Sequence, residues 1–271
     1  MNVPPGQAPQ PQPMPPRSQE PRFQPVLIYG IIAVTAFAYL IQIITQSPDG
    51  SDLLSALGAK DNAAIIQGQL WRLVTPLFLH GSIFHIGANM YSLYILGPIL
   101  ERFYGRRRFL LLYFLAGISG NIASFYFTRV DSIGASTAIF GLAAAQVVFV
   151  LRNRAIFGGQ SRSILTNLFV VIAINLALGF AVPGIDYFGH LGGLVGGFAF
   201  AWFAGPVLKW QTVVRDYSAE ANQAYPAIET PFPQVRPLLV DQVSSSQAWL
   251  TAGIELLCFV LLVVVRMMRP A

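Results

Sequence analysis

The chain has 271 residues, of which 54% are hydrophobic and 11% are charged, and its formal net charge is +5. Soluble domains carry charge on about a quarter of their residues, so this composition excludes an ordinary soluble domain. The single cysteine, Cys258, excludes a disulfide framework and a cysteine-rich zinc site. A pI of about 9.6 also fits nucleic-acid binding, but the basic residues are spread over loops between apolar segments, so we expect no nucleic-acid partner.

The chain begins with a proline-rich segment. Residues 1–25 hold nine prolines and few apolar side chains, so they cannot bury a core. We predict a disordered, partly extended tail over 1–25. Both a solvated tail and a proline-rich docking segment fit this composition, and we favour the solvated tail.

Seven apolar segments follow, and each has the length and composition of a membrane-crossing helix or nearly so. They are predicted at 26–44, 80–100, 108–128, 135–151, 164–182, 187–208 and 248–267. The sequence therefore predicts an all-α polytopic membrane protein with a six-helix core over 26–208. The polar segment 209–247 is predicted to be a cytoplasmic linker to a seventh transmembrane helix at 248–267. The first span has no convincing cleavage site after it, which indicates an uncleaved helix.

The distribution of basic residues predicts the orientation in the membrane. When the seven spans alternate, 12 of the 17 Lys and Arg residues fall on the side of the N-terminus. The positive-inside rule then places the N-terminus in the cytoplasm and the C-terminus outside, and we expect a bacterial plasma membrane. The largest outer loop, 45–79, holds Trp71 and two short apolar patches, which favours an element lying in the membrane interface.

Polar side chains in the predicted spans gather near the outer face. The chain's three histidines, His80, His85 and His190, all lie in or at the start of spans, where each polar group needs a partner. Asn89 lies one turn after His85, and Ser136 begins the fourth span. Spans two, four and six all run inward from the outer side, so these five groups share one depth. A helix cap or interhelical hydrogen bonding explains each residue alone, but their shared depth favours a common site.

These residue types indicate acyl transfer. A serine hydroxyl is a weak nucleophile unless a base takes its proton, and His190 is the candidate base for Ser136. Asp186 lies four residues before His190 in an outer loop, so we favour a Ser–His dyad over a triad. The side chains of His85 and Asn89 and the backbone N–H of Ser136 are candidate donors to an oxyanion. This chemistry requires no metal and no cofactor.

Glycines near these residues favour close helix packing. Gly193 and Gly197 have the four-residue spacing that lets two helices pack backbone to backbone. Gly134 and Gly141 offer a matching smooth surface beside Ser136. A Ser–His hydrogen bond between two helices needs this close approach, although tight packing without chemistry has the same signature.

At these residues the sequence resembles the rhomboid family of intramembrane serine proteases, over roughly residues 65–205. The matching motifs are "WR" at Trp71–Arg72, "HGSIFHIGANM" from His80, "GPILERFYG" around Glu101, "GASTAIFG" around Ser136 and "GHLGGLVGG" around His190. The resemblance implies a six-helix bundle with a water-filled cavity, and the additional C-terminal helix is similar to the six-plus-one arrangement of part of the family.

The resemblance also implies a role for each matching residue. Ser136 would be the nucleophile and His190 the base, His85 and Asn89 would contribute to the oxyanion site, and His80 would be structural. Phe140 takes the place of an aromatic residue that the family stacks against the base. The remaining matches are supporting residues: Trp71, Arg72, Glu101, Gly134, Gly193 and Gly197.

One residue departs from the family pattern. The family usually has glycine directly after the nucleophile, and here that residue is Thr137. A β-branched side chain adds bulk beside the oxyanion site, and we expect it to impede the approach of spans four and six. We therefore expect activity to survive at a reduced level.

The preferred function is an endopeptidase that cuts single-span membrane proteins near the outer face of the lipid bilayer. Helix-breaking residues in the substrate should assist it, because a protease must unwind a helix to reach its backbone. A non-catalytic rhomboid-like protein that binds membrane clients is the main alternative, and Thr137 keeps it open. A solute or proton carrier ranks last, because Glu101, at a cytoplasmic end, is the only acidic residue in the core spans.

Overall fold

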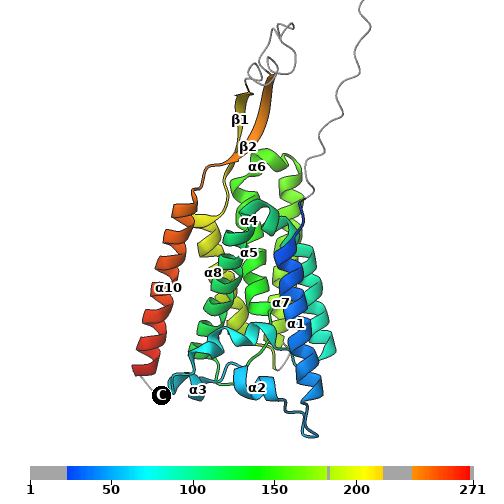
Figure 1. Ribbon diagram of the computed structural model, residues 1–271, viewed down its shortest axis with the longest axis vertical. Coiled ribbons are helices and arrows are strands. Elements are labelled where there is room, and N and C mark those ends of the chain that lie inside the picture. The colour runs from blue at the N-terminus through cyan, green and yellow to red at the C-terminus, as the bar shows by residue number, and fades with distance from the viewer. Residues whose placement is uncertain (1–22, 182–183, 216–233, 269–271) are drawn as a thin grey trace, which may run out of the picture.

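The computed structural model describes residues 23–181, 184–215 and 234–268. Within these ranges, long helices run side by side in one bundle, and a two-stranded sheet projects from one end of it (Figure 1). The predicted disordered tail falls outside the described residues, apart from 23–25. Both the start of the described chain and the sheet lie at one end of the bundle, and the C-terminus lies at the other end (Figure 1).

Six long helices form the bundle: α1 (Val26–Ile44), α4 (Ile83–Phe127), α5 (Ser136–Arg152), α7 (Gln160–Ala181), α8 (Tyr187–Ala204) and α10 (Ser245–Met268). Helix α4 is two helices that double back at Gly105, whose φ of 73° and ψ of 159° are open to glycine but strained for other residues. Counting both halves, these helices correspond in order to the seven predicted spans. The predicted fold class, an all-α polytopic membrane protein, is confirmed.

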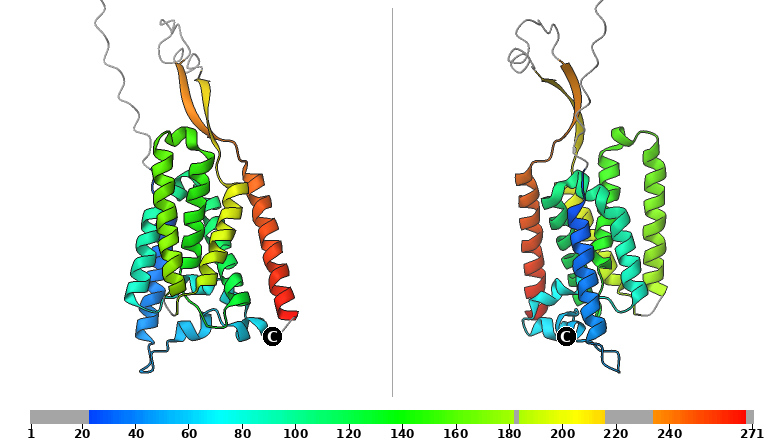
Figure 2. Two further views of the ribbon diagram at one scale, coloured as in Figure 1. Left: turned by 180° about the vertical axis from the view of Figure 1, so that it is seen from behind. Right: turned by 45° about the vertical axis from the view of Figure 1, so that its right-hand side comes forward.

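Length and composition alone qualify four of the described helices as membrane spans, namely α1, α4, α7 and α10. Helix α5 is a shorter apolar helix of 17 residues, and α8, with 18 residues, is not among the four. Side chains of α5 are almost all buried, because α4 and α8 pack on it and form the core. Helix α10 stands at one side of the bundle and α7 at the other (Figure 2).

Two helix ends differ from the predicted spans. The second span was expected from residue 80, but α4 begins at Ile83 because the Ser82 hydroxyl caps it, accepting a hydrogen bond from the His85 N–H at 3.2 Å. His80 therefore lies in the turn before the helix. The sixth span was expected to reach residue 208, but α8 ends at Ala204, where Gly205 turns extended and Pro206 cannot continue a helix.

The outer loop 45–79 is folded into short helices at the end of the bundle opposite the sheet (Figure 1). They are α2 (Leu53–Gly58), α3 (Asn62–Ile66), η1 (Leu70–Leu73) and η2 (Thr75–Phe78). The buried Arg72 guanidinium ties them together by donating to the carbonyls of Ala56 and Ala59, each at 2.8 Å. The Trp71 indole donates to the carbonyl of Leu57 at 3.0 Å. The "WR" pair thus holds the loop in one shape.

The segment expected to be a plain linker contains two strands. Strands β1 (Leu208–Arg215) and β2 (Gln234–Asp241) pair antiparallel, with Leu208 opposite Asp241. The aromatic and β-branched residues of "LKWQTVVR" are the strand signal that the linker prediction overlooked. Arg108 anchors the base of the pair through a salt bridge to Asp241, and the Leu208 N–H donates to Asn153 at 2.7 Å. A short helix, α6 (Arg154–Phe157), lies at the same end.

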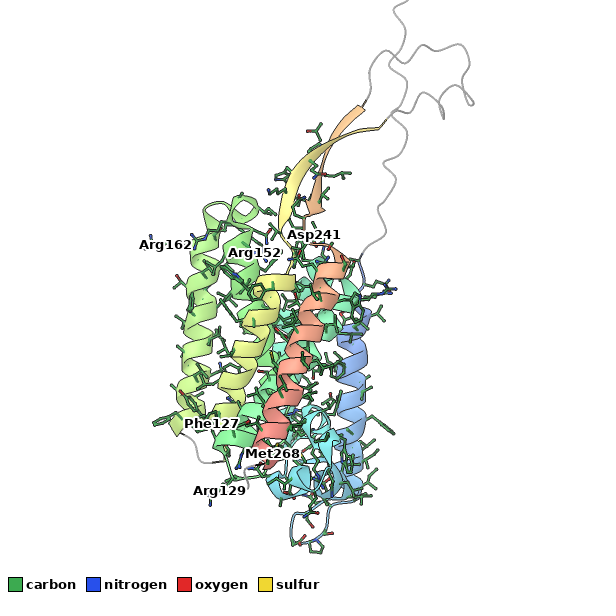
Figure 3. The ribbon with its side chains drawn as sticks, turned by 90° about the vertical axis from the view of Figure 1, so that its left-hand side faces the viewer. Phe127, Arg129, Arg152, Arg162, Asp241 and Met268 are labelled. Carbon is green, nitrogen blue, oxygen red and sulfur yellow. The ribbon has the colours of Figure 1, made fainter. Side chains whose placement is uncertain are left out.

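Figure 3 shows residues of the connecting loops and helix ends at the two ends of the bundle. Arg152, Arg162 and Asp241 lie at the end that carries the sheet. Phe127, Arg129 and Met268 lie at the opposite end, with the short helices of the outer loop. The loops therefore divide between the two ends in the way that the predicted alternation of spans requires.

Candidate active site

The structure brings Ser136 and His190 into hydrogen-bonding contact. Ser136 is the first residue of α5, His190 lies in the first turn of α8, and the Ser136 Oγ lies 2.9 Å from the His190 Nε2. A neutral imidazole with its proton on Nδ1 accepts the hydroxyl proton at Nε2 in this arrangement. This is the distance at which a base activates a serine.

Glycines allow α5 and α8 to come this close. A Cβ on Gly193 would lie 2.0 Å from the carbonyl oxygen of Thr137, and a Cβ on Gly197 would lie 2.3 Å from the Cα of Gly141. No real side chain fits at such distances, so the two backbones touch directly. The glycine pattern in the sequence thus corresponds to an actual backbone-to-backbone contact beside the dyad residues.

The expected obstruction by Thr137 does not arise. Thr137 is buried, and Gly120 of α4 and Gly189 of α8 leave the space that its side chain fills. A Cβ on Gly120 would lie 2.6 Å from the Thr137 Cβ, and one on Gly189 would lie 3.1 Å from the Thr137 Cγ2. The expectation that Thr137 holds the helices apart is therefore wrong, because two neighbouring glycines compensate for its bulk.

Other contacts fix the imidazole of His190. The Phe140 ring stacks on it, with the ring centroids 4.3 Å apart and the planes 22° from parallel. Asp186 caps α8, since its Oδ1 accepts from the Gly189 N–H at 2.9 Å. Within the described residues, neither the His190 Nδ1 nor the second Asp186 oxygen has a hydrogen-bond partner. Asp186 therefore orients the helix and leaves the ring nitrogen unpaired, which is the geometry of a dyad.

The candidate oxyanion residues come from the first turns of α4. A Cβ on Gly134 would lie 2.7 Å from the His85 Nε2 and 3.5 Å from the Ser136 Oγ, so these two atoms flank one small space. Gly134 has a φ of 135° and its N–H donates to the Pro76 carbonyl at 2.9 Å. The Asn89 side chain is buried, and its Nδ2 donates to no described residue. Asn89 thus carries an unused donor on the helix face of His85.

His80 links several of these parts. Its side chain is 1% exposed, and its ring meets the ring of His85 edge to face at 4.9 Å. The His80 Nε2 accepts from the Ala135 N–H at 3.4 Å, directly before Ser136. Its backbone N–H donates to the Gln42 Oε1 at 3.0 Å. His80 therefore lies behind the site and contacts its backbone, outside the position where a substrate would react.

Two contributors escaped the sequence analysis. The fully buried Lys60 donates to the Val130 carbonyl at 2.7 Å and to the Asn62 Oδ1 at 3.0 Å, and its backbone pairs with that of Ser132. Burial lowers the pKa of Lys60, while nearby aspartates, Asp186 foremost, oppose this change. Lys60 thereby fastens the outer loop to the segment that leads into Ser136. No pattern in the sequence marks it.

Gln42 is the second such residue, and it had a detectable signal. It is a buried amide near the outer end of α1, inside an otherwise apolar span. A search for polar groups in spans that stops at ionisable side chains passes over it.

Glu101 lies far from the dyad residues, at the sheet end of the bundle. Its two carboxylate oxygens accept from the N–H groups of Leu27 and Ile28, each at 3.1 Å, and its side chain is fully buried. N–H groups in the first turn of a helix have no acceptor within the helix itself, and negative charge is favourable at this end. Glu101 is therefore a helix cap supplied from α4, and it takes no part in the site at the outer end.

Comparison with known proteins places these features in a family. The sequence profile of the Rhomboid domain matches residues 67–207, more than half of the chain. The chain belongs to the rhomboid family. The resemblance drawn from the motifs is thereby confirmed, and the chain is an integral membrane protein.

Individual relatives agree with this assignment. Rhomboid protease GluP of Bacillus subtilis is 46% identical over 175 residues, covering 65% of this chain and 34% of the relative. RHOMBOID-like protein 1 of Arabidopsis thaliana is 42% identical over 147 residues, covering 54% of this chain and 37% of the relative. The putative rhomboid protease YdcA of B. subtilis is 39% identical over 140 residues, 51% of this chain and 68% of the relative. The chain spans little more than a third of the first two relatives.

Proposed function

We propose that this rhomboid family member is a serine-type intramembrane endopeptidase that uses a Ser136–His190 dyad. The observation that carries the proposal is the 2.9 Å contact between the Ser136 Oγ and the His190 Nε2, made between two helices that touch through glycine backbones. The names of two relatives, both called rhomboid proteases, agree with it.

The proposed reaction follows from the positions of the groups. His190 takes the hydroxyl proton as the Ser136 Oγ attacks the carbonyl carbon of a peptide bond. The resulting oxyanion accepts hydrogen bonds from His85, Asn89 and the Ser136 N–H. The proton on His190 then passes to the departing amine, which leaves an acyl-enzyme. Water, deprotonated by the same imidazole, attacks the ester carbonyl; the bond to Oγ then breaks, and His190 returns the proton to the Ser136 Oγ as the carboxylic acid product leaves.

The substrate class follows from the location of the site. The dyad residues lie at the end of the bundle that holds the outer loop, and the basic residues assign that end to the outside. A cavity of about 390 Å³ opens at the same end, with His80, Gly81 and Ile133 in its wall, on the side of His80 away from Ser136 and His190, which do not line it. Substrates would be membrane proteins, preferably single-span, cut near the outer face of a bacterial plasma membrane. The N-terminus would lie in the cytoplasm and the C-terminus outside.

The test uses the full chain in liposomes with a single-span substrate and a serine-directed fluorophosphonate probe. Wild type should cleave the substrate and take up the probe, and Ser136→Ala and His190→Ala should do neither. Ser92→Ala is the matched control, because Ser92 lies half-buried on α4 and, among the described residues, its hydroxyl bonds only back to the Ala88 carbonyl. It should behave as wild type.

The opposite outcome would favour the alternative function. A folded wild-type protein that neither cleaves nor labels, yet retains a single-span protein in pull-down from liposomes, would be a client-binding rhomboid-like protein. Cleavage that persists in Ser136→Ala would overturn the assignment of the nucleophile.

A further inference from the structure

The side chain of Gln42 joins α1 to two other parts of the outer end. Its Oε1 accepts from the backbone N–H of His80 at 3.0 Å. Its Nε2 donates to the Asp52 Oδ2 at 3.2 Å and to the Ser55 Oγ at 2.9 Å. The Gln42 side chain is 4% exposed, whereas Asp52 and Ser55 are half-buried and line, with Gln42, a cavity of about 390 Å³ at this end of the bundle. One amide therefore connects α1 with the start of α2 and with the turn before α4.

The bond to His80 lies two contacts away from the candidate nucleophile. The His80 Nε2 accepts from the N–H of Ala135, the residue that precedes Ser136 at the start of α5. The His80 ring also sets the position of the His85 ring, through an edge-to-face contact at 4.9 Å. A shift of the His80 backbone would thus move both the serine end of α5 and a candidate oxyanion donor.

The amide is matched chemically to these partners. A backbone N–H needs an acceptor, and the Asp52 carboxylate needs a donor, so the residue between them must offer one of each. Asp52 cannot turn away freely, because its other oxygen caps α2 by accepting from the Ser55 N–H at 2.9 Å. Leucine would leave the His80 N–H unpaired, and glutamate would place two carboxylates together.

We infer that Gln42 is a positioning residue that holds His80, and through it Ser136 and His85, in the geometry for peptide cleavage. This inference rests on the proposed protease function. It predicts that Gln42 affects the rate of the chemical step more than the binding of substrate, since its bond to His80 acts through His80 on Ser136 and His85. Misplacement of reacting groups by about 1 Å costs on the order of a hundredfold in rate.

The decisive experiment exchanges the donor and acceptor between residues 42 and 52. Gln42→Glu alone should lower kcat and the rate of fluorophosphonate labelling by about ten- to a hundredfold, with KM within about twofold of wild type. The double variant Gln42→Glu/Asp52→Asn re-forms the bond between residues 42 and 52 with the donor now on residue 52, and the asparagine introduced at the cap position can still cap α2. It should recover most of the lost rate. Gln67→Glu makes the same chemical change on an exposed loop residue and should match wild type.

The outcomes separate the two proposals. An inactive wild-type protein overturns the protease function and, with it, this inference. An active wild type with unaltered kcat in Gln42→Glu overturns the inference alone. Equal losses in the single and double variants, or a loss confined to KM, would also overturn it. If Gln42→Glu folds poorly, labelling of Gln42→Glu/Asp52→Asn against Asp52→Asn alone decides: a faster double variant supports positioning, and a slower one refutes it.

Discussion

Gly120 on α4 and Thr137 on α5 form a matched pair: the absent side chain of one leaves the space for the side chain of the other. A Cβ on Gly120 would lie 2.6 Å from the Thr137 Cβ and 2.5 Å from the Gly189 carbonyl oxygen. Three helices therefore meet at this point, directly below the dyad residues. The bulk that Thr137 brings beside Ser136 is absorbed by its neighbours, and the contact between Ser136 and His190 is kept.

This pairing makes Gly120→Ala a sensitive change. We expect it to lower the free energy of unfolding by about 1–3 kcal/mol, because extra volume in a filled core forces helices apart. Probe labelling of Ser136 should slow as α5 and α8 separate. The control is Gly253→Ala on α10, where a new Cβ meets nothing within 4 Å. Adding Thr137→Gly to Gly120→Ala should restore part of the stability; equal unfolding of the single and double variants would contradict the pairing.

Glu101→Leu should lower the free energy of unfolding by removing the cap of α1 at the sheet end of the bundle. The change leaves two buried N–H groups, those of Leu27 and Ile28, without their acceptor, and each such group costs about 1–3 kcal/mol. Glu101→Gln keeps one acceptor oxygen and should lose less. Both are measured by thermal unfolding in detergent. Arg106→Ala is the control: Arg106 lies 4.0 Å from Glu101 but is 61% exposed, so its loss should matter little.

We expect the contribution of Asp52 to the free energy of unfolding to depend on pH. Partial burial opposes its ionisation, but hydrogen bonds donated by Ser55 and Gln42 outweigh this, so the pKa of Asp52 lies below its usual value. A carboxyl with a lowered pKa stabilises the fold above its unfolded pKa, and that stabilisation is lost as the pH falls through the folded pKa. The difference in unfolding free energy between wild type and Asp52→Asn should be constant above about pH 5 and shrink below about pH 4. A difference that grows on acidification would refute the Asp52 contacts.

The orientation can be tested with single cysteines. In a Cys258→Ser background, Arg129→Cys and Lys209→Cys each place one thiol in an exposed position: Arg129 lies at one end of the bundle (Figure 3), and Lys209 lies in β1 at the opposite end (Figure 1). A membrane-impermeant maleimide added to intact cells should label the cysteine at 129 and spare the one at 209. After the cells are lysed, both should label. The reverse pattern in intact cells would invert the topology and move the site to the cytoplasmic side.

Much of this architecture was readable from the sequence because bilayer-spanning helices have an unmistakable length and composition. The proximity of Ser136 and His190 could also be anticipated, since both are polar groups in apolar segments and the alternation of spans put them at one depth. Their actual contact depends on Gly193 and Gly197, whose spacing was visible. The family motifs added the roles.

What the sequence could not provide were effects that depend on three-dimensional neighbours. The room for Thr137 comes from Gly120 and Gly189, which lie 17 and 52 positions away in the chain and have no sequence signature of their own. The burial of Lys60 arises from carbonyls of a distant loop. Strands β1 and β2 were missed because a polar, proline-containing segment has the composition of a linker, and the pairing of one strand with the other is not visible in the sequence of either.

The separation of the dyad along the chain has a consequence for biosynthesis. Ser136 and His190 are 54 residues apart, with α7 between them. At translation rates of about 5–20 residues per second, the serine leaves the ribosome roughly 3–11 s before the histidine. During that interval the hydroxyl has no base and is a weak nucleophile. Under the proposed mechanism, a nascent chain whose first five spans are inserted therefore cannot yet cleave other proteins at the translocation site, and insertion of α8 completes the proposed dyad.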